Sequence, residues 1–75
     1  MTFVARIVSL CKDGNLTCRR QVFQPMDRSF LDLEDSEPVD VVPLKQFARV
    51  EIGRLVIVHA MGGHPGCLPL YVCEV

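Results

Sequence analysis

Two apolar segments separated by a turn signal constrain the fold of this chain most. Residues 3–11 (FVARIVSLC) and 16–24 (LTCRRQVFQ) are rich in apolar and β-branched side chains, and KDGN lies between them. Asp-Gly and Gly-Asn pairs between such segments are typical of tight β-hairpin turns. The chain is therefore predicted to begin with an antiparallel β-hairpin.

The register of this hairpin has two alternatives. If Lys12, Asp13 and Gly14 form a three-residue loop with Gly14 left-handed, Arg6 opposes Arg20, and one face collects the apolar set Val4, Val8, Leu10, Leu16, Cys18 and Val22. If Gly14-Asn15 forms a two-residue loop, Cys11 faces Cys18 directly. A slip of one residue turns every side chain to the other face, so the sequence leaves both registers open.

Residues 25–40 (PMDRSFLDLEDSEPVD) interrupt the strand pattern and are predicted to form an acidic loop. The stretch holds six of the nine acidic residues and begins with a proline. One interpretation is a solvated loop held down by Phe30, Leu31 and Leu33. The alternative is an acidic-hydrophobic segment that docks on a basic partner.

The C-terminal part of the chain carries a second hairpin signal. Residues 54–61 (RLVIVHAM) and 70–75 (LYVCEV) have the composition of strands, and the glycine-rich GGHPG lies between them. Because proline lacks an N–H group, Pro69 next to the last strand suggests an edge position. We expect these two strands to pair.

The segment 43–50 is ambiguous. Leu44, Phe47 and Val50 recur every three residues and Pro43 suits a first helical position, which favours one short helix. The β-branched residues of 48–52 favour a strand instead, with Gly53 as a bulge or bend. The fold class is accordingly mainly β, or α+β if the short helix forms.

The length bounds the architecture. With 75 residues, the chain is expected to be one domain over residues 1–75. Two antiparallel hairpins then give a small barrel or a two-layer sheet of four or five strands.

Composition indicates more apolar surface than one small core can hide. The chain is 49% hydrophobic, yet a domain near this size buries only about 60% of the surface of its unfolded chain. We therefore expect a homo-oligomer, or a protein whose apolar surface is covered by a partner.

Charge and hydropathy narrow the classes of partner and location. A net charge of −1 offers no field that would attract nucleic acid or anionic lipid. No apolar run has transmembrane length and no signal peptide is visible, which favours a cytoplasmic protein with reduced cysteines and no membrane contact.

These observations favour a non-enzymatic protein–protein interaction module, such as a small adaptor, inhibitor or assembly subunit. It would act through an apolar surface and the acidic-hydrophobic loop, on a partner with a basic surface. The predicted contact residues are Phe30, Leu31, Asp32, Leu33, Glu34, Asp35, Glu37, Phe47 and Tyr71.

The stretch HAMGGHPGC (59–67) raises the alternative of a zinc-stabilised module. A structural zinc site needs four nitrogen or sulfur ligands, and His64, Cys67, Cys11 and Cys18 supply the required types. Their spacing does not match a zinc knuckle, so a hairpin loop without cofactor is the preferred interpretation. His64 and Cys67 also lack a third orienting group, so no catalytic residues are predicted.

A third alternative is a β-sheet that binds single-stranded nucleic acid. Arg19 and Arg20 form the basic cluster of the first hairpin, and Phe23 could stack on a base beside them. Strand alternation places the two arginines on opposite faces, so nucleic-acid binding is less favoured than protein binding.

Overall fold

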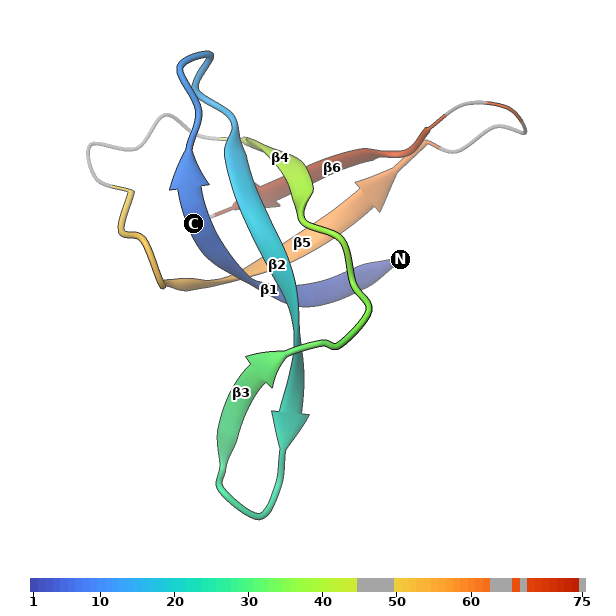
Figure 1. Ribbon diagram of the computed structural model, residues 1–75. Coiled ribbons are helices and arrows are strands. Elements are labelled where there is room, and N and C mark those ends of the chain that lie inside the picture. The colour runs from blue at the N-terminus through green and yellow to red at the C-terminus, as the bar shows by residue number, and fades with distance from the viewer. Residues whose placement is uncertain (45–49, 63–65, 67, 75) are drawn as a thin grey trace.

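The computed structural model (Figure 1) describes residues 1–44, 50–62, 66 and 68–74. The strands run in the order β1 (Thr2–Leu10), β2 (Leu16–Gln24), β3 (Ser29–Asp32), β4 (Val39–Pro43), β5 (Leu55–Met61) and β6 (Leu70–Glu74). The described residues contain no helix, and none of them forms a segment able to cross a membrane as a helix. The mainly β prediction is confirmed, whereas the short helix proposed for 43–50 falls chiefly on residues outside the described ones.

Five strands close into a barrel. The order is β1-β5-β6-β4-β2, and β2 also pairs with β1, so the sheet returns to its start. All pairings are antiparallel except that of β4 with β6, which is parallel. The sixth strand, β3, pairs with the far end of β2 and extends the sheet away from the barrel.

The first hairpin forms with the three-residue loop. The Cys11 N–H donates to the Asn15 carbonyl at 2.9 Å, and Gly14 has φ of 90°. A β-bulge between Ile7 and Ser9 then shifts the register, so that Ile7 pairs with Cys18. Bulges place an extra residue in one strand and so exchange the two faces beyond that point.

The bulge corrects two expectations about that hairpin. Phe3, Ala5 and Ile7 are buried, whereas Val8 is exposed and Val4 is half-buried on the outer surface. The expected apolar face containing Val4 and Val8 was therefore wrong. Arg6 lies opposite Arg19, not Arg20.

The second hairpin is confirmed, but its predicted edge position is wrong. β6 pairs with β5 on one side and with β4 on the other, because closure of the barrel places it between them. The strand alternative for 48–52 also fails in its described part. Residues 50–54 form a turn, in which the Gly53 N–H donates to the Ile7 carbonyl at 2.7 Å and Gly53 has φ of 91°.

The predicted acidic loop is partly strand. Residues 29–32 form β3 and residues 39–40 begin β4, so only the connections at 25–28 and 33–38 are irregular. Alternation of apolar residues in SFLD is too short to separate from a loop by pattern alone, and pairing with β2 decides it.

The barrel interior is filled by one aromatic side chain and by small or branched side chains, contributed by all five barrel strands. They are Phe3, Ala5, Ile7, Leu16, Cys18, Val41, Val56, Val58 and Cys73. Tyr71 packs against this cluster and meets the Phe3 ring edge-on, with the ring centroids 5.8 Å apart. Two cysteines, Cys18 and Cys73, are therefore core residues of the barrel.

Burial makes these two thiols resistant to ionisation. Desolvation, with a smaller contribution from the charge of Cys73, raises the pKa of Cys18 to about 12, and desolvation also raises the pKa of Cys73. Because the folded protein holds these thiol protons more tightly than the unfolded chain does, ionisation of the unfolded chain at alkaline pH favours unfolding.

We therefore expect the free energy of unfolding to fall as pH rises from about 9 towards 12. Urea titrations at several alkaline pH values measure this slope. Cys18→Ala should flatten it, although its stability at neutral pH is also lower because the side chain leaves a cavity. An equal slope in both proteins would contradict the assignment to Cys18.

Candidate binding surface

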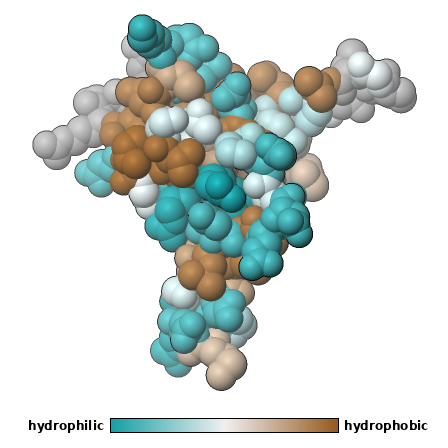
Figure 2. All heavy atoms as spheres, in the orientation of Figure 1, coloured by the Kyte–Doolittle hydropathy of each residue, from teal (hydrophilic) through white to brown (hydrophobic). Residues whose placement is uncertain are grey.

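The β2–β3 hairpin projects from the barrel as an arm (Figures 1 and 2). Gln21–Gln24 pair with Ser29–Asp32, and residues 25–28 form the turn, where Arg28 has φ of 51°. Several large apolar side chains on the arm are exposed, and Met26 at its tip is 93% exposed. The others are Val22, Phe23 and Leu31. Because a two-stranded ribbon is only marginally stable by itself, this arm depends on contacts at its base.

A groove lies beside the base of the arm, on the outer face of β1 and β5. Its volume is about 520 Å³, and its lining residues are Val4, Phe30, Arg54, Leu55, Val56, Ile57 and His59. β5 (LVIVHAM) is apolar on both faces over its first four residues. Val56 and Val58 point into the barrel, so alternation turns Leu55 and Ile57 outwards, where Ile57 is 53% exposed.

The arm and the groove form one continuous surface because Phe30 belongs to both. Phe30 lines the groove, and its ring contacts the Phe23 ring across the arm, with the ring centroids 5.2 Å apart. Figure 2 shows hydrophobic side chains at the base of the arm and on the body above it. We call this set, Val4, Phe23, Met26, Phe30, Leu55 and Ile57, the arm–groove surface.

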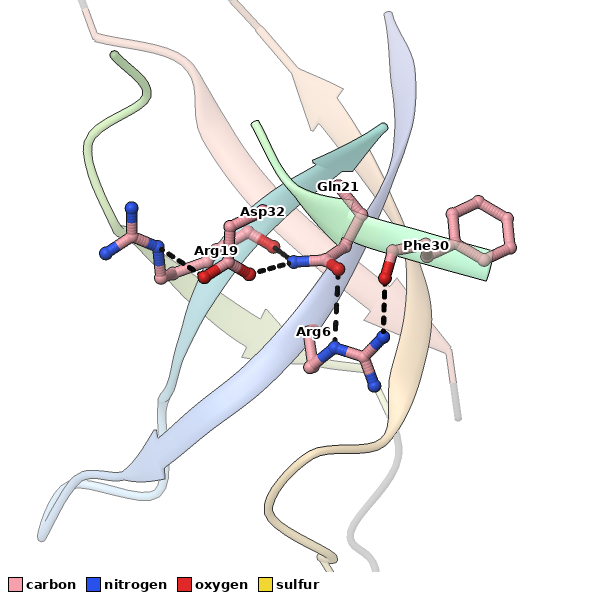
Figure 3. Close-up of polar contacts among 5 residues, drawn as sticks. All are labelled: Arg6, Arg19, Gln21, Phe30 and Asp32. Atoms are coloured by element: carbon pink, nitrogen blue, oxygen red, sulfur yellow. Dashed lines mark hydrogen bonds and ion pairs between the residues drawn. The ribbon is translucent and has the colours of Figure 1, made fainter. Parts of the chain in front are cut away.

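A polar network holds the arm to the barrel (Figure 3). Gln21 is 7% exposed and its side-chain amide donates to Asp32 Oδ1 at 2.6 Å and to the Arg19 carbonyl at 3.2 Å. Its Oε1 accepts from Arg6 Nε at 3.3 Å. Arg19 Nε lies 3.6 Å from Asp32 Oδ2. Since buried polar groups without partners are destabilising, these bonds stabilise Gln21 and connect Asp32 on the arm to Arg6 and Arg19.

Arg6 joins the arm to the turn before β5. Its Nη1 donates to the Gly53 carbonyl at 2.8 Å and its Nη2 donates to the Phe30 carbonyl at 3.3 Å. One guanidinium therefore bridges the arm and the turn that precedes β5. In the described part of the chain, no buried side-chain nitrogen or oxygen lacks a hydrogen-bond partner.

The predicted partner-binding residues fall into three groups. Phe30 and Leu31 lie on the arm, on opposite faces because they are consecutive in β3. Glu34, Asp35 and Glu37 are exposed between β3 and β4, and Leu33 there is half-buried. Asp32 and Tyr71 have structural contacts instead, with Gln21 and Phe3 respectively. Phe47 lies outside the described residues.

The proposed zinc ligands are not brought together where they are described. Cys18 is fully buried in the barrel, whereas Cys11 Sγ lies 3.4 Å from Thr17 Oγ1, on the opposite face of β2. His64 and Cys67 lie outside the described residues. Within the described part, no group of three or more His, Cys, Asp or Glu side chains could hold a metal ion.

The proposed nucleic-acid residues do not converge either. Arg19 is paired with Asp32, and the Arg20 guanidinium lies 4.7 Å from the centroid of the Phe3 ring. Phe23 is exposed on the arm beside Phe30. The expected separation of Arg19 and Arg20 by strand alternation is confirmed by their different contacts.

The sequence prediction missed the groove and the network. Val4, Leu55 and Ile57 were not predicted as contact residues. A barrel strand that is apolar on both faces must nevertheless expose one of its two faces. Gln21 and Arg6 carried no signal, because their role arises from pairings between distant segments.

The groove also has a polar rim. Arg54 and His59 are exposed at it, and His59 Nδ1 lies 3.2 Å from Thr2 Oγ1. An apolar floor with a polar rim is the usual construction of a protein-binding surface. Comparison of the chain with protein families, with curated proteins and with solved structures found no match.

Proposed function

We propose that this chain is a non-enzymatic protein-binding module whose contact surface is the arm–groove surface. The observation that carries the proposal is that apolar side chains line the groove and that Phe30, one of them, connects the groove to the exposed Phe23 ring on the arm. Contiguous apolar surface bordered by polar side chains is typical of interaction sites.

The shape supports a macromolecular partner. Phe30 links the groove to the arm, which carries the exposed side chains Phe23 and Met26. A partner that lies in the groove and along the arm would bury aromatic and methionine side chains, which are enriched in interface centres. Exposed Glu34, Asp35 and Glu37 beside the arm would favour a partner with basic groups at its edge.

Ile57→Asp tests this function. A carboxylate in the centre of the groove would have to be desolvated when a partner binds, so partner capture from the native host should be abolished. The matched control is Leu10→Asp, because Leu10 is 56% exposed and Ile57 is 53% exposed, but Leu10 lies at the β1–β2 turn. Quantitative mass spectrometry of captured proteins provides the measurement.

Two results are informative in that experiment. A protein captured by the wild type and by Leu10→Asp but not by Ile57→Asp supports the proposal. Equal capture by all three, with unchanged circular dichroism, contradicts it.

The barrel connectivity favours a second candidate, binding of single-stranded nucleic acid. The closed order β1-β2-β4-β6-β5 with one parallel pair resembles the OB-fold, a five-stranded Greek-key barrel that binds oligonucleotides on a strand face and adjoining loops. The exposed Phe23–Phe30 pair offers a stacking surface. Fold likeness alone does not establish function, and the pairing of Arg19 with Asp32 reduces the basic character of this face. Fluorescence anisotropy with labelled oligonucleotides at low salt, repeated with Phe23→Ala, separates the two candidates.

A further inference from the structure

The chain exposes more surface than a compact monomer of its mass. Its accessible surface is 5631 Å², whereas the scaling for monomeric proteins gives about 4,600 Å² at this mass. Its radius of gyration is 12.6 Å, against about 11.3 Å for a compact domain of this length. The surplus of about 1,000 Å² is close to the roughly 800 Å² that each partner buries in a standard interface.

The arm is a projection and the groove is a recess, and both belong to the same molecule. The arm ends in an exposed methionine, a flexible side chain that fills irregular apolar spaces. The groove of about 520 Å³ is floored by Val4, Leu55 and Ile57. When a projection and a recess lie on one chain, two copies can satisfy both at once around a twofold axis, and the assembly is then closed.

The charges of the two parts do not oppose this contact. Arg54 and His59 are exposed at the groove, and no carboxylate is among the described residues that line it. The tip of the arm exposes one acidic and one basic side chain, Asp27 and Arg28, so it carries no net charge. Because the net charge is only −1, two copies would approach without strong repulsion.

We infer that the occupant of the arm–groove surface is a second copy of this chain, and that each copy places its β2–β3 arm on the β1–β5 groove of the other. This inference rests on the proposed function, since it assigns a partner to the same surface. In the dimer Met26 of one copy contacts Ile57 of the other, and Asp27 lies near Arg54.

Sedimentation equilibrium of the purified chain tests the dimer. The wild type should approach a mass of twice 8.4 kDa as concentration rises. Met26→Asp should weaken the dimer by at least about 30-fold in Kd, because the symmetric interface receives the buried carboxylate twice. Leu10→Asp should leave the Kd unchanged. Met26 is 93% exposed, so its substitution does not disturb the folded monomer.

Disulfide trapping tests the contact itself. Met26→Cys and Ile57→Cys proteins, both with Cys11 and Cys67 replaced by serine, are mixed and mildly oxidised. A disulfide between the two introduced cysteines is expected, identified by peptide mass spectrometry. A partner protein carrying Leu10→Cys in place of Ile57→Cys should form none.

The outcomes separate this inference from the proposed function. A wild type that stays monomeric at all concentrations overturns the dimer, and capture of another protein that still depends on Ile57 would then leave the proposed function standing. A dimer unaffected by Met26→Asp also overturns the inference. If Ile57→Asp loses neither partner capture nor dimerisation, both the proposed function and the dimer are contradicted.

Discussion

Leu16→Ala is expected to lower the free energy of unfolding by about 2–5 kcal/mol, the range for a buried leucine whose cavity does not collapse. Leu16 is fully buried in the barrel and pairs with Leu10 on one side and Val41 on the other. A domain of this length has a total stability of about 4–11 kcal/mol. The variant is therefore expected to be largely unfolded well below the melting temperature of the wild type.

Thermal and urea unfolding, followed by circular dichroism, measure this effect. The control is Leu10→Ala on the paired position across the hairpin, which should change stability by less than about 0.5 kcal/mol because Leu10 is exposed. Similar losses in the two variants would mean that the hairpin does not bury Leu16 in the register described.

The local part of the fold could be predicted because its signals are local. The KDGN turn specifies the β1–β2 hairpin through Gly14, which adopts the left-handed conformation that glycine tolerates best. β5 and β6 were identified from their β-branched and apolar runs. Each of these predictions needed only residues close together in the chain.

Closure of the barrel could not be predicted in the same way. The parallel pairing of Val42 with Val72 joins residues far apart in sequence, and no turn sequence indicates that they pair. The bulge between Ile7 and Ser9 likewise has no glycine or proline to mark it, yet it decides which face of β1 is buried. A prediction of core residues from alternation alone therefore chose Val4 and Val8 wrongly.

The binding surface was predicted only on the arm. Phe30 and Leu31 were selected because they are apolar residues in an acidic stretch, and both lie on the projecting hairpin. The other half of the surface, with Ile57, belongs to a strand that pattern analysis treats as interior. Its exposure follows from closure of the barrel, since one face of every barrel strand points outwards.

The second large effect is expected at Gln21, which links the arm to the barrel. Gln21→Leu keeps a side chain of similar size but removes the donor to Asp32 Oδ1 and the acceptor for Arg6 Nε. Partly buried charged groups that lose their partners are destabilising by about 1–3 kcal/mol. The loss of stability should be concentrated in the arm, because this network and Phe30 connect the arm to the barrel.

Native-state hydrogen exchange measures that local effect. In Gln21→Leu the amides of β3, including Leu31 that pairs with Val22, should exchange roughly 5- to 150-fold faster, which corresponds to the same 1–3 kcal/mol. The barrel amides of Ile7 and Val58 should change much less. Thr17→Val is the matched control, because Thr17 is on the same outward face of β2 but contacts Cys11 instead of the arm. Uniformly faster exchange over barrel and arm would show that Gln21 stabilises the whole domain and does not act as the hinge of the arm.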